Sequence, residues 1–186
     1  APSKAGRAPM SAKGDVSRCI PDYQAHTNTY APTYVLSRLF NEALTYDSAI
    51  GLDIATRADC LPPDVCALLA EIAEKTDLTV ELGLQSSNDD TARLIGRGHD
   101  FAAFRDGYAR LRAASDKISV CVHIILGLPG EDDEMMMQTV RDTAELHPEF
   151  VKLDLLHVLS DTALRCMNRD GRYPGLPAGH SVSLFV

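Results

Sequence analysis

The feature that most constrains the fold is an alternation of two patterns from residue 19 onward. Short runs of apolar and β-branched residues alternate with longer stretches whose apolar residues recur at helical spacing. The short runs are Cys19–Gln24, Ala49–Ile54, Leu78–Leu84, Ile118–Leu126 and Phe150–Leu156. The helical stretches are Val35–Leu44, Leu61–Ile72, Phe101–Leu111 and Met135–Ala144. Strand and helix in repeated succession predict an α/β fold, with a parallel sheet covered by helices.

The flanking residues support this phase but weaken the first strand. Pro21 lies inside the first run, and proline cannot donate a hydrogen bond to a neighbouring strand. Pro62 and Pro63 suit the first turn of a helix. The acidic run from Glu131 to Glu134 precedes the methionine-rich helix, where the positive end of the helix dipole stabilises carboxylates.

Polar residues follow several of the predicted strands. Ligands of parallel α/β proteins bind at the carboxyl ends of the strands, so these residues predict a binding site there. The most informative segment is the turn Gly127-Leu128-Pro129-Gly130, because two glycines allow positive φ angles and a close approach of backbone amides to a ligand. Taken alone, this turn is better explained as a tight strand-to-helix connection without a ligand.

Length and composition indicate one ordinary globular domain or a large part of a longer protein. The chain has 186 residues and a net charge of −8, which argues against binding nucleic acid through bulk electrostatics. No apolar run approaches the roughly 20 residues of a transmembrane helix. The 5 cysteines are far apart and form no CxxC pair, which favours free thiols in a reducing, cytoplasmic compartment.

The ends of the chain differ in composition from its middle. Residues 1–18 carry almost no large apolar side chain, so we expect a flexible tail there. Residues 168–186 are rich in glycine and proline and predict an irregular C-terminal tail. The folded domain is therefore predicted to span residues 19–167.

Six segments of this chain, in order, resemble the radical S-adenosylmethionine (radical SAM) superfamily. They are QAHTNTYAP from Gln24, GLDIATRADCLPPDV, VELGLQSSND, RLIGRGHDF, IILGLPGE and LDLLHVL. Together they are most similar to a YhcC-like branch related to the catalytic subunit of elongator. They resemble the oxygen-independent coproporphyrinogen oxidases more distantly. The resemblance extends from about Cys19 to about Leu164.

The resemblance implies a fold, a cofactor and a set of site residues. It implies a partial (β/α)6 barrel of about five βα units, matching the second to sixth strands of the family. It also implies that Gln85 and Arg97 bind S-adenosylmethionine (SAM), that Asp53 occupies an acidic position of the coproporphyrinogen oxidases, and that His123 stands where those relatives carry an aspartate. The turn formed by Gly127, Leu128, Pro129 and Gly130 would pack against adenine. Arginine suits the carboxylate of SAM and glutamine suits the ribose diol.

One defining family feature has no counterpart in this chain. The superfamily holds a 4Fe-4S cluster with three cysteines upstream of the QAHTNTYAP segment, and residues 1–18 contain no cysteine. The sequence therefore predicts no metal ligand here, and the chain is expected to be a fragment that is inactive alone. The full oxidoreductase would generate a 5′-deoxyadenosyl radical and use it on a substrate that the sequence does not identify.

Two other hypotheses remain open from the sequence. The chain could be a degenerate, cluster-free domain that binds SAM or a partner without catalysis. It could also be an unrelated barrel enzyme with a metal site at Asp53, Glu81 and His123. Elongator relatives act on tRNA, so RNA is implied as a substrate by family analogy alone.

Overall fold

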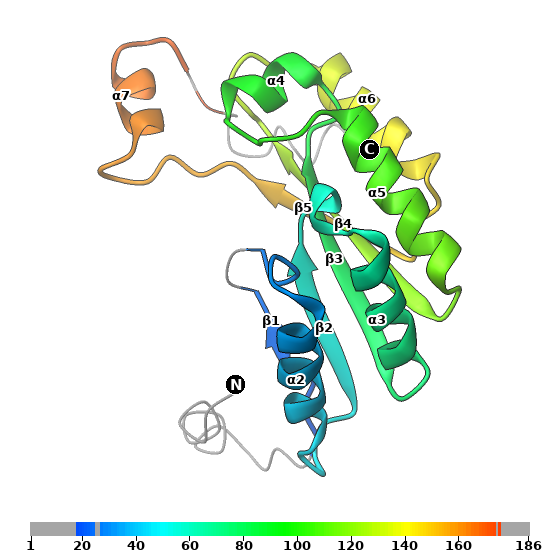
Figure 1. The fold of residues 1–186 in the computed structure, drawn as a ribbon. Coiled ribbons are helices and arrows are strands. Elements are labelled where there is room, and N and C mark those ends of the chain that lie inside the picture. The colour runs from blue at the N-terminus through cyan, green and yellow to red at the C-terminus, as the bar shows by residue number, and fades with distance from the viewer. Residues whose placement is uncertain (1–17, 25–26, 174, 176–186) are drawn as a thin grey trace. The chain divides into compact units, whose positions relative to one another are not determined.

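The computed structural model describes residues 18–24, 27–173 and 175. Most of the predicted tails, residues 1–17 and 176–186, therefore lie outside the described residues. The described strands form one five-stranded parallel sheet in the order β1-β2-β3-β4-β5, as the alternating pattern predicts (Figure 1). The chain divides into two compact units. The first comprises residues up to Gly83 together with Arg105–Cys121, and the second comprises Leu84–Phe104 together with the residues from Val122 onward.

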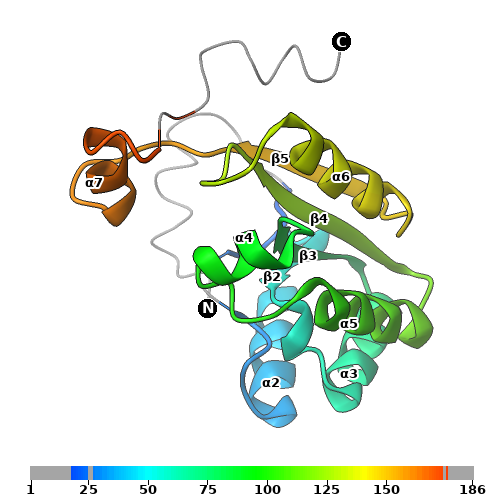
Figure 2. The ribbon, with the colours of Figure 1, turned by 90° about the horizontal axis from the view of Figure 1, so that it is seen from above.

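In the first unit, helices cover one face of the first three strands. The strands are β1 (Asp22–Tyr23), β2 (Gly51–Thr56) and β3 (Asp77–Gln85, which continues into the second unit), and the helices include α2 (Thr33–Leu44) and α3 (Pro63–Ala73). Figures 1 and 2 show α2 and α3 along the same face of these strands. The side chains on this face alternate along β2 and β3 and are buried; they include Leu52, Ile54, Leu78, Val80 and Leu82. Alternation with period two follows from the pleat of a strand.

Strand β1 is shorter than the sequence predicts. It pairs with β2 only from Asp22 to Tyr23, and an isolated parallel bridge joins Cys19 to Ala49. Pro21 lies between these two pairings and contributes only its carbonyl, which accepts a hydrogen bond from the Asp53 amide at 2.9 Å. The missing N–H of proline explains the interruption.

A close backbone contact holds the main part of α5 (Phe101–Ala114), from Arg105 onward, in the first unit. Gly107 faces a short 3-10 turn, η1 (Ala58–Cys60), and an added Cβ at Gly107 would lie 2.1 Å from the carbonyl oxygen of Ala58. Arg110 on the same helix donates to the carbonyl of Leu61 at 3.0 Å. Only glycine permits this approach.

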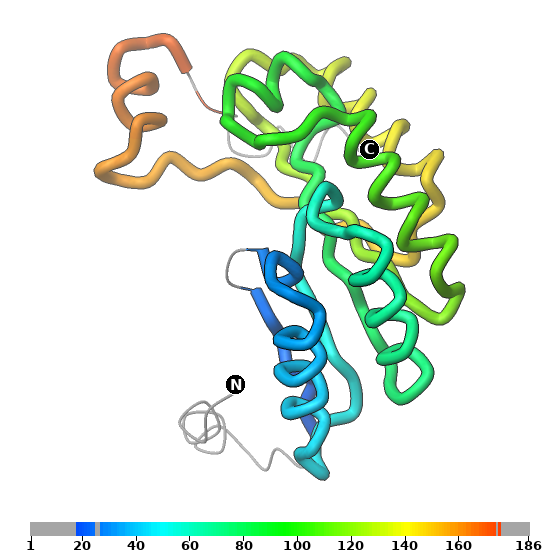
Figure 3. The backbone as a smooth tube through the Cα atoms, in the orientation of Figure 1, coloured from blue at the N-terminus to red at the C-terminus, as the bar shows by residue number. Residues whose placement is uncertain are grey.

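The second unit contains the ends of β3 and β4 (Ile118–Leu126), strand β5 (Phe150–Leu155), and helices α4 (Asp89–Leu94), α6 (Asp133–Ala144) and α7 (Ala163–Arg169). Figure 3 follows the backbone from β5 out to α7, a helix with no buried residue. The pattern of apolar residues did not predict α4 and α7, because both helices are short and lack an apolar face of several turns. Each begins with a side-chain cap, Asn88 for α4 and Thr162 for α7. No helix among the described residues is long and apolar enough to cross a membrane.

Candidate functional site

A polar face of β2 and β3 lies opposite the apolar face that the helices cover. Asp53 and Thr79 are paired in register, and Ala55 and Glu81 are paired two residues later. Burial raises the pKa of Asp53 above its usual value, the charge of Glu81 adds to this, and a hydrogen bond from Thr79 acts in the opposite direction. Glu81 accepts a hydrogen bond from Gln24 Nε2 at 2.6 Å. This face of the first unit therefore holds two carboxyl groups among polar partners.

The loop after β1 is tied to the end of β2. Asn28 Nδ2 donates to the carbonyls of Tyr23 at 2.6 Å and Ala55 at 2.9 Å. The hydroxyl of Thr29 lies 2.6 Å from that of Thr56 and donates to the carbonyl of Cys60. Asn28 and Thr29 of the QAHTNTYAP segment thus form hydrogen bonds with backbone groups of the first unit. The sequence alone could not distinguish this structural role from ligand binding. Ala25 and His26 of the motif lie outside the described residues.

Gln85, the last residue of β3, has a left-handed backbone with φ 73°. A non-glycine residue in this region costs about 1–3 kcal/mol and persists only where its surroundings enforce it. Residues of this kind cluster at ligand sites and turns. Among the described residues, His147 and Asp161 also have positive φ but lie in loops, whereas Gln85 ends a strand.

The segment after Gln85 is held by hydrogen bonds of several hydroxyl groups. The Ser86 hydroxyl donates to the Glu131 carboxylate and accepts from the Asn88 amide at 3.0 Å. The Ser87 amide donates to Thr139 Oγ1 on α6 at 3.1 Å. Ser86 and Thr139 are each 3% exposed, so this network is shielded from water.

The turn Gly127–Gly130 has the conformation that its glycines predict. Gly127 has φ 80° and Gly130 has φ 88°. The Gly127 amide points to Met136 Sδ at 3.2 Å, and the Gly127 carbonyl accepts a hydrogen bond from Tyr173 Oη at 2.5 Å. Between the glycines, Leu128 and Pro129 are buried. The turn therefore has a defined backbone conformation, and its two apolar side chains are packed inside the protein.

Glu131 has a different role from the one its position suggests. The sequence assigns it to the dipole of the following helix, whereas the structure uses Asp132 as the N-cap, accepting from the Met135 amide at 2.9 Å. Glu131 accepts a hydrogen bond from Ser86. Burial raises the pKa of Glu131, hydrogen bonding by Ser86 and Thr91 lowers it, and the charge of Asp132 raises it.

Arg97 follows α4 in a glycine-rich loop of the second unit. It lies between Gly96 with φ 66° and Gly98 with φ 86° and is half-buried. Its amide donates to the carbonyl of Ala92 at 2.9 Å, which closes the loop against the helix. The backbone at this position is therefore fixed by its neighbours.

The predicted site residues are divided between the two units. Within the second unit, the bond between Ser86 and Glu131 connects the neighbours of Gln85 and Gly130. Asp53 belongs to the first unit, and His123 lies on the half-exposed face of β4. The sequence reasoning missed Ser86 and Tyr173, and it did not predict the contact of Glu131 with Ser86. A carboxylate directly after the Gly-Leu-Pro-Gly turn was the available signal for Glu131.

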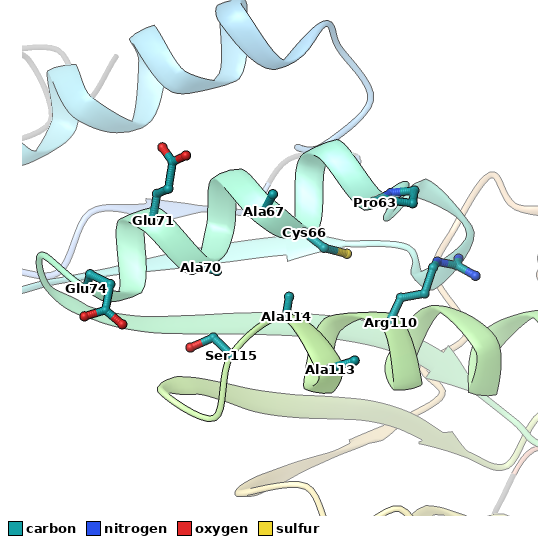
Figure 4. Close-up of a pocket in the computed structure, with 10 residues that line it drawn as sticks. All are labelled: Pro63, Cys66, Ala67, Ala70, Glu71, Glu74, Arg110, Ala113, Ala114 and Ser115. Carbon is teal, nitrogen blue, oxygen red and sulfur yellow. The ribbon is translucent and has the colours of Figure 1, made fainter.

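Two surface grooves do not include any of the predicted residues. A groove of about 620 Å³ lies between α3 and α5 in the first unit, and Figure 4 shows alanines from both helices along it. Its lining residues are Pro63, Cys66, Ala67, Ala70, Glu71, Glu74, Arg110, Ala113, Ala114 and Ser115. A second groove, of about 310 Å³, is lined by Ser87, Asn88, Glu134, Met135, Gln138 and Asp142 of the second unit. Across the described part of the chain, no three His, Cys, Asp or Glu side chains are grouped to hold a metal ion.

Known proteins of similar sequence point to one family. The radical SAM superfamily matches residues 22–143. YtqA of Bacillus subtilis (strain 168) is 46% identical over 155 residues, covering 83% of this chain and 48% of YtqA. YhcC of Escherichia coli (strain K12) is 34% identical over 160 residues, covering 86% of this chain and 51% of YhcC. A tRNA uridine(34) acetyltransferase of Dehalococcoides mccartyi (strain CBDB1) is 30% identical over 170 residues, covering 88% of this chain and 35% of that protein.

Solved structures support the fold alone, because their sequence identity is low. The archaeal Methanocaldococcus infernus Elp3 with an N-terminal deletion of residues 1–46 has a TM-score of 0.71 at 18% identity, covering 90% of this chain and 43% of Elp3. Coproporphyrinogen III oxidase from Escherichia coli, itself a radical SAM enzyme, has a TM-score of 0.65 at 23% identity, covering 93% of this chain and 39% of the oxidase.

These findings confirm both the predicted barrel-type α/β fold and the branch. The chain spans about half the length of YtqA and YhcC. Full-length members of the family use SAM and a 4Fe-4S cluster. The fold of this chain does not by itself show that it binds either of them. By sequence and by fold, this chain belongs to the radical SAM superfamily, in the branch that contains YtqA and YhcC.

Proposed function

We propose that this chain binds SAM through the second unit, with Gln85, Arg97 and the turn Gly127–Gly130. The observation that carries the proposal is the left-handed backbone of Gln85, one residue from the hydrogen bond that ties its loop to this turn. A strained residue at the end of a central strand is typical of ligand sites in parallel α/β proteins.

The chemistry of these side chains fits SAM. The guanidinium of Arg97 can bind the carboxylate of the methionine part through two parallel hydrogen bonds. The amide of Gln85 can donate to one ribose hydroxyl and accept from the other. Gly130 is exposed and has no side chain, so adenine can approach the backbone of the turn Gly127–Gly130.

Isothermal titration calorimetry of the chain with SAM tests this proposal. We expect saturable binding that Arg97→Ala weakens by about tenfold or more, because a charge-assisted pair contributes about 1.5–3 kcal/mol. Arg93→Ala is the matched control, since Arg93 is an exposed arginine of the neighbouring helix that pairs with Asp90. Absence of SAM binding to the wild-type chain would refute the proposal.

We further propose that this chain is the barrel portion of a longer radical SAM enzyme and is inactive alone. When a 4Fe-4S cluster reduces it, SAM supplies a 5′-deoxyadenosyl radical in this superfamily. The cysteines of this chain lie apart, and no metal-binding group of three ligands is present among the described residues. Anaerobic iron–sulfur reconstitution should therefore give no stoichiometric cluster absorption. A full cluster on this chain would contradict the proposal, whereas SAM binding without a cluster in any longer natural form would favour a non-catalytic binding domain.

RNA is the substrate class that we propose for the longer enzyme. The supporting observation is the 30% identity to a protein named as a tRNA uridine(34) acetyltransferase. The net charge of −8 gives no independent support. Fluorescence anisotropy with unfractionated tRNA, measured at two salt concentrations, tests whether the barrel portion contributes. Equal, weak binding of tRNA and of a DNA duplex would remove this support.

A further inference from the structure

We propose that Glu131 is a positioning residue for the SAM site: its carboxylate fastens Ser86 to the turn Gly127–Gly130 and thereby holds Gln85 in its left-handed conformation. The inference rests on the proposed function, because it concerns the same loops. It assigns a role to a side chain that itself need not touch the ligand.

The first step is the attachment of Glu131 to the turn. Glu131 directly follows Gly130, and its amide donates to the carbonyl of Leu128 at 3.2 Å. Its backbone is therefore part of the turn. A side-chain contact of Glu131 therefore restrains the turn Gly127–Gly130, which is expected to face adenine.

The second step is the contact across to β3. The hydroxyl of Ser86 donates to the carboxylate of Glu131. Ser86 is 3% exposed, so water competes poorly for this hydrogen bond. Bonds from neutral donors to a carboxylate are stronger than those between neutral groups.

The third step is the direction of the bond at Ser86. Its hydroxyl accepts from the Asn88 amide at 3.0 Å, so its single proton is available for Glu131. The two bonds orient the backbone on the C-terminal side of Gln85. A left-handed glutamine needs such fixed neighbours, because most of its alternative conformations lie at negative φ.

If Glu131 acted only on helix α6, its removal would leave the segment after Gln85 unchanged. As a carboxylate next to the N-cap of α6, it would interact with the helix dipole and affect only that helix. Glu134 in the first turn of α6 provides the matched control, because it is acidic, exposed and paired with Arg141. Glu134→Ala removes the same charge without touching Ser86.

Hydrogen–deuterium exchange tests the fastening without any ligand. In Glu131→Ala we expect faster exchange in residues 84–92, about 40 residues away in sequence, by at least tenfold in the slowest amides. Glu134→Ala should leave this segment unchanged, and Glu131→Gln should restore part of the protection, since its amide oxygen still accepts from Ser86. Ser86→Ala, a smaller change, should reproduce the effect if Glu131→Ala folds poorly. Unchanged exchange in residues 84–92 of a folded Glu131→Ala or Ser86→Ala protein would overturn the inference.

Calorimetry with SAM then separates this inference from the proposed function. Glu131→Ala and Ser86→Ala should each raise the Kd by about tenfold, and the double variant should also raise it by about tenfold rather than a hundredfold, because both remove one connection. If wild type binds SAM and both variants bind equally well, the positioning role is wrong while the proposed function stands. If wild type does not bind SAM, the proposed function fails, and the exchange experiment still decides whether Glu131 holds Gln85.

Discussion

At the scale of single residues, Gln85 shows how a side chain can be chemically suited to a role and still depend on its backbone. The sequence motif pointed to Gln85, but nothing in the sequence pattern predicted its φ of 73°. That angle arises because Ser86 and Ser87 are bound by Glu131 and Thr139, which lie 45 and 52 residues away. Long-range hydrogen bonds of this kind leave no local periodicity.

The strain at Gln85 predicts an inverted order of stability. At an ordinary strand position, a glycine variant has a free energy of unfolding about 0.5–1 kcal/mol lower than the alanine variant. At Gln85 we expect the glycine variant to be more stable than the alanine variant by about 1 kcal/mol, because only alanine retains the strain. Urea unfolding of both variants measures the difference. The same pair of substitutions at Thr79 on the same strand should show the ordinary order, and the ordinary order at Gln85 would contradict the prediction.

Asp53 predicts a pH dependence of stability. Its pKa in the folded chain is raised above the usual 3.8, chiefly by burial, so the folded state holds the proton to higher pH than the unfolded state does. Stability that is fully present below pH 3.8 is therefore lost as the pH rises through the folded pKa. Asp53→Asn should remove this loss, so its advantage over wild type should grow from near zero in acid to a small plateau at neutral pH.

Urea unfolding at a series of pH values measures the effect of Asp53→Asn. Asp106→Asn serves as the control, because Asp106 is exposed on α5. An advantage of Asp53→Asn that is the same at every pH would contradict the argument from titration.

At the scale of elements, the helices and strands with long periodic patterns were predictable and the short ones were not. Strand β4 has the predicted bounds, Ile118–Leu126, because nine residues of apolar and β-branched character admit one interpretation. Helix α4 escaped prediction because its six residues depend on Asn88, whose side chain accepts from the amides of Asp90 and Thr91. A capping side chain of this kind is visible only once the helix is known.

The contact of α5 with the turn η1 gives a prediction at this scale. Gly107→Ala should destabilise the chain by about 1–3 kcal/mol or more, because the new methyl group would meet the backbone of Ala58 rather than a movable side chain. This loss outweighs the gain in helix propensity of about 1 kcal/mol. Thermal unfolding measures it, with Asp106→Ala as an exposed neighbour expected to change stability by less than about 0.5 kcal/mol. A Gly107→Ala protein as stable as wild type would show that α5 can move away.

At the scale of the whole molecule, contacts between distant segments define the candidate site. Tyr173 follows α7 near the end of the described chain, yet its hydroxyl donates to the carbonyl of Gly127, 46 residues earlier. The side chain is 5% exposed, so the contact is buried. The glycine- and proline-rich C-terminal region was predicted to be irregular, and its composition contains no sign of this anchoring.

Removing the hydroxyl of Tyr173 should loosen the turn. Tyr173→Phe leaves the Gly127 carbonyl without this buried donor, at a cost of about 1–3 kcal/mol. We expect faster hydrogen–deuterium exchange in residues 126–131 and unchanged exchange in α3 of the first unit. Tyr34→Phe is the control, because Tyr34 is 77% exposed. Equal exchange in wild type and Tyr173→Phe would mean that the hydrogen bond does not hold the turn.

The sequence alone determined the alternation of strands and helices, the apolar face of each, and the superfamily, because periodic burial and local motifs are written in consecutive residues. The predicted turn Gly127–Gly130 belongs to this class, since positive φ angles are intrinsic to glycine. Tertiary structure alone decided the backbone of Gln85, the partners of Glu131 and the anchoring by Tyr173. Each of these depends on hydrogen bonds between buried groups that become neighbours only after the strands and helices have packed.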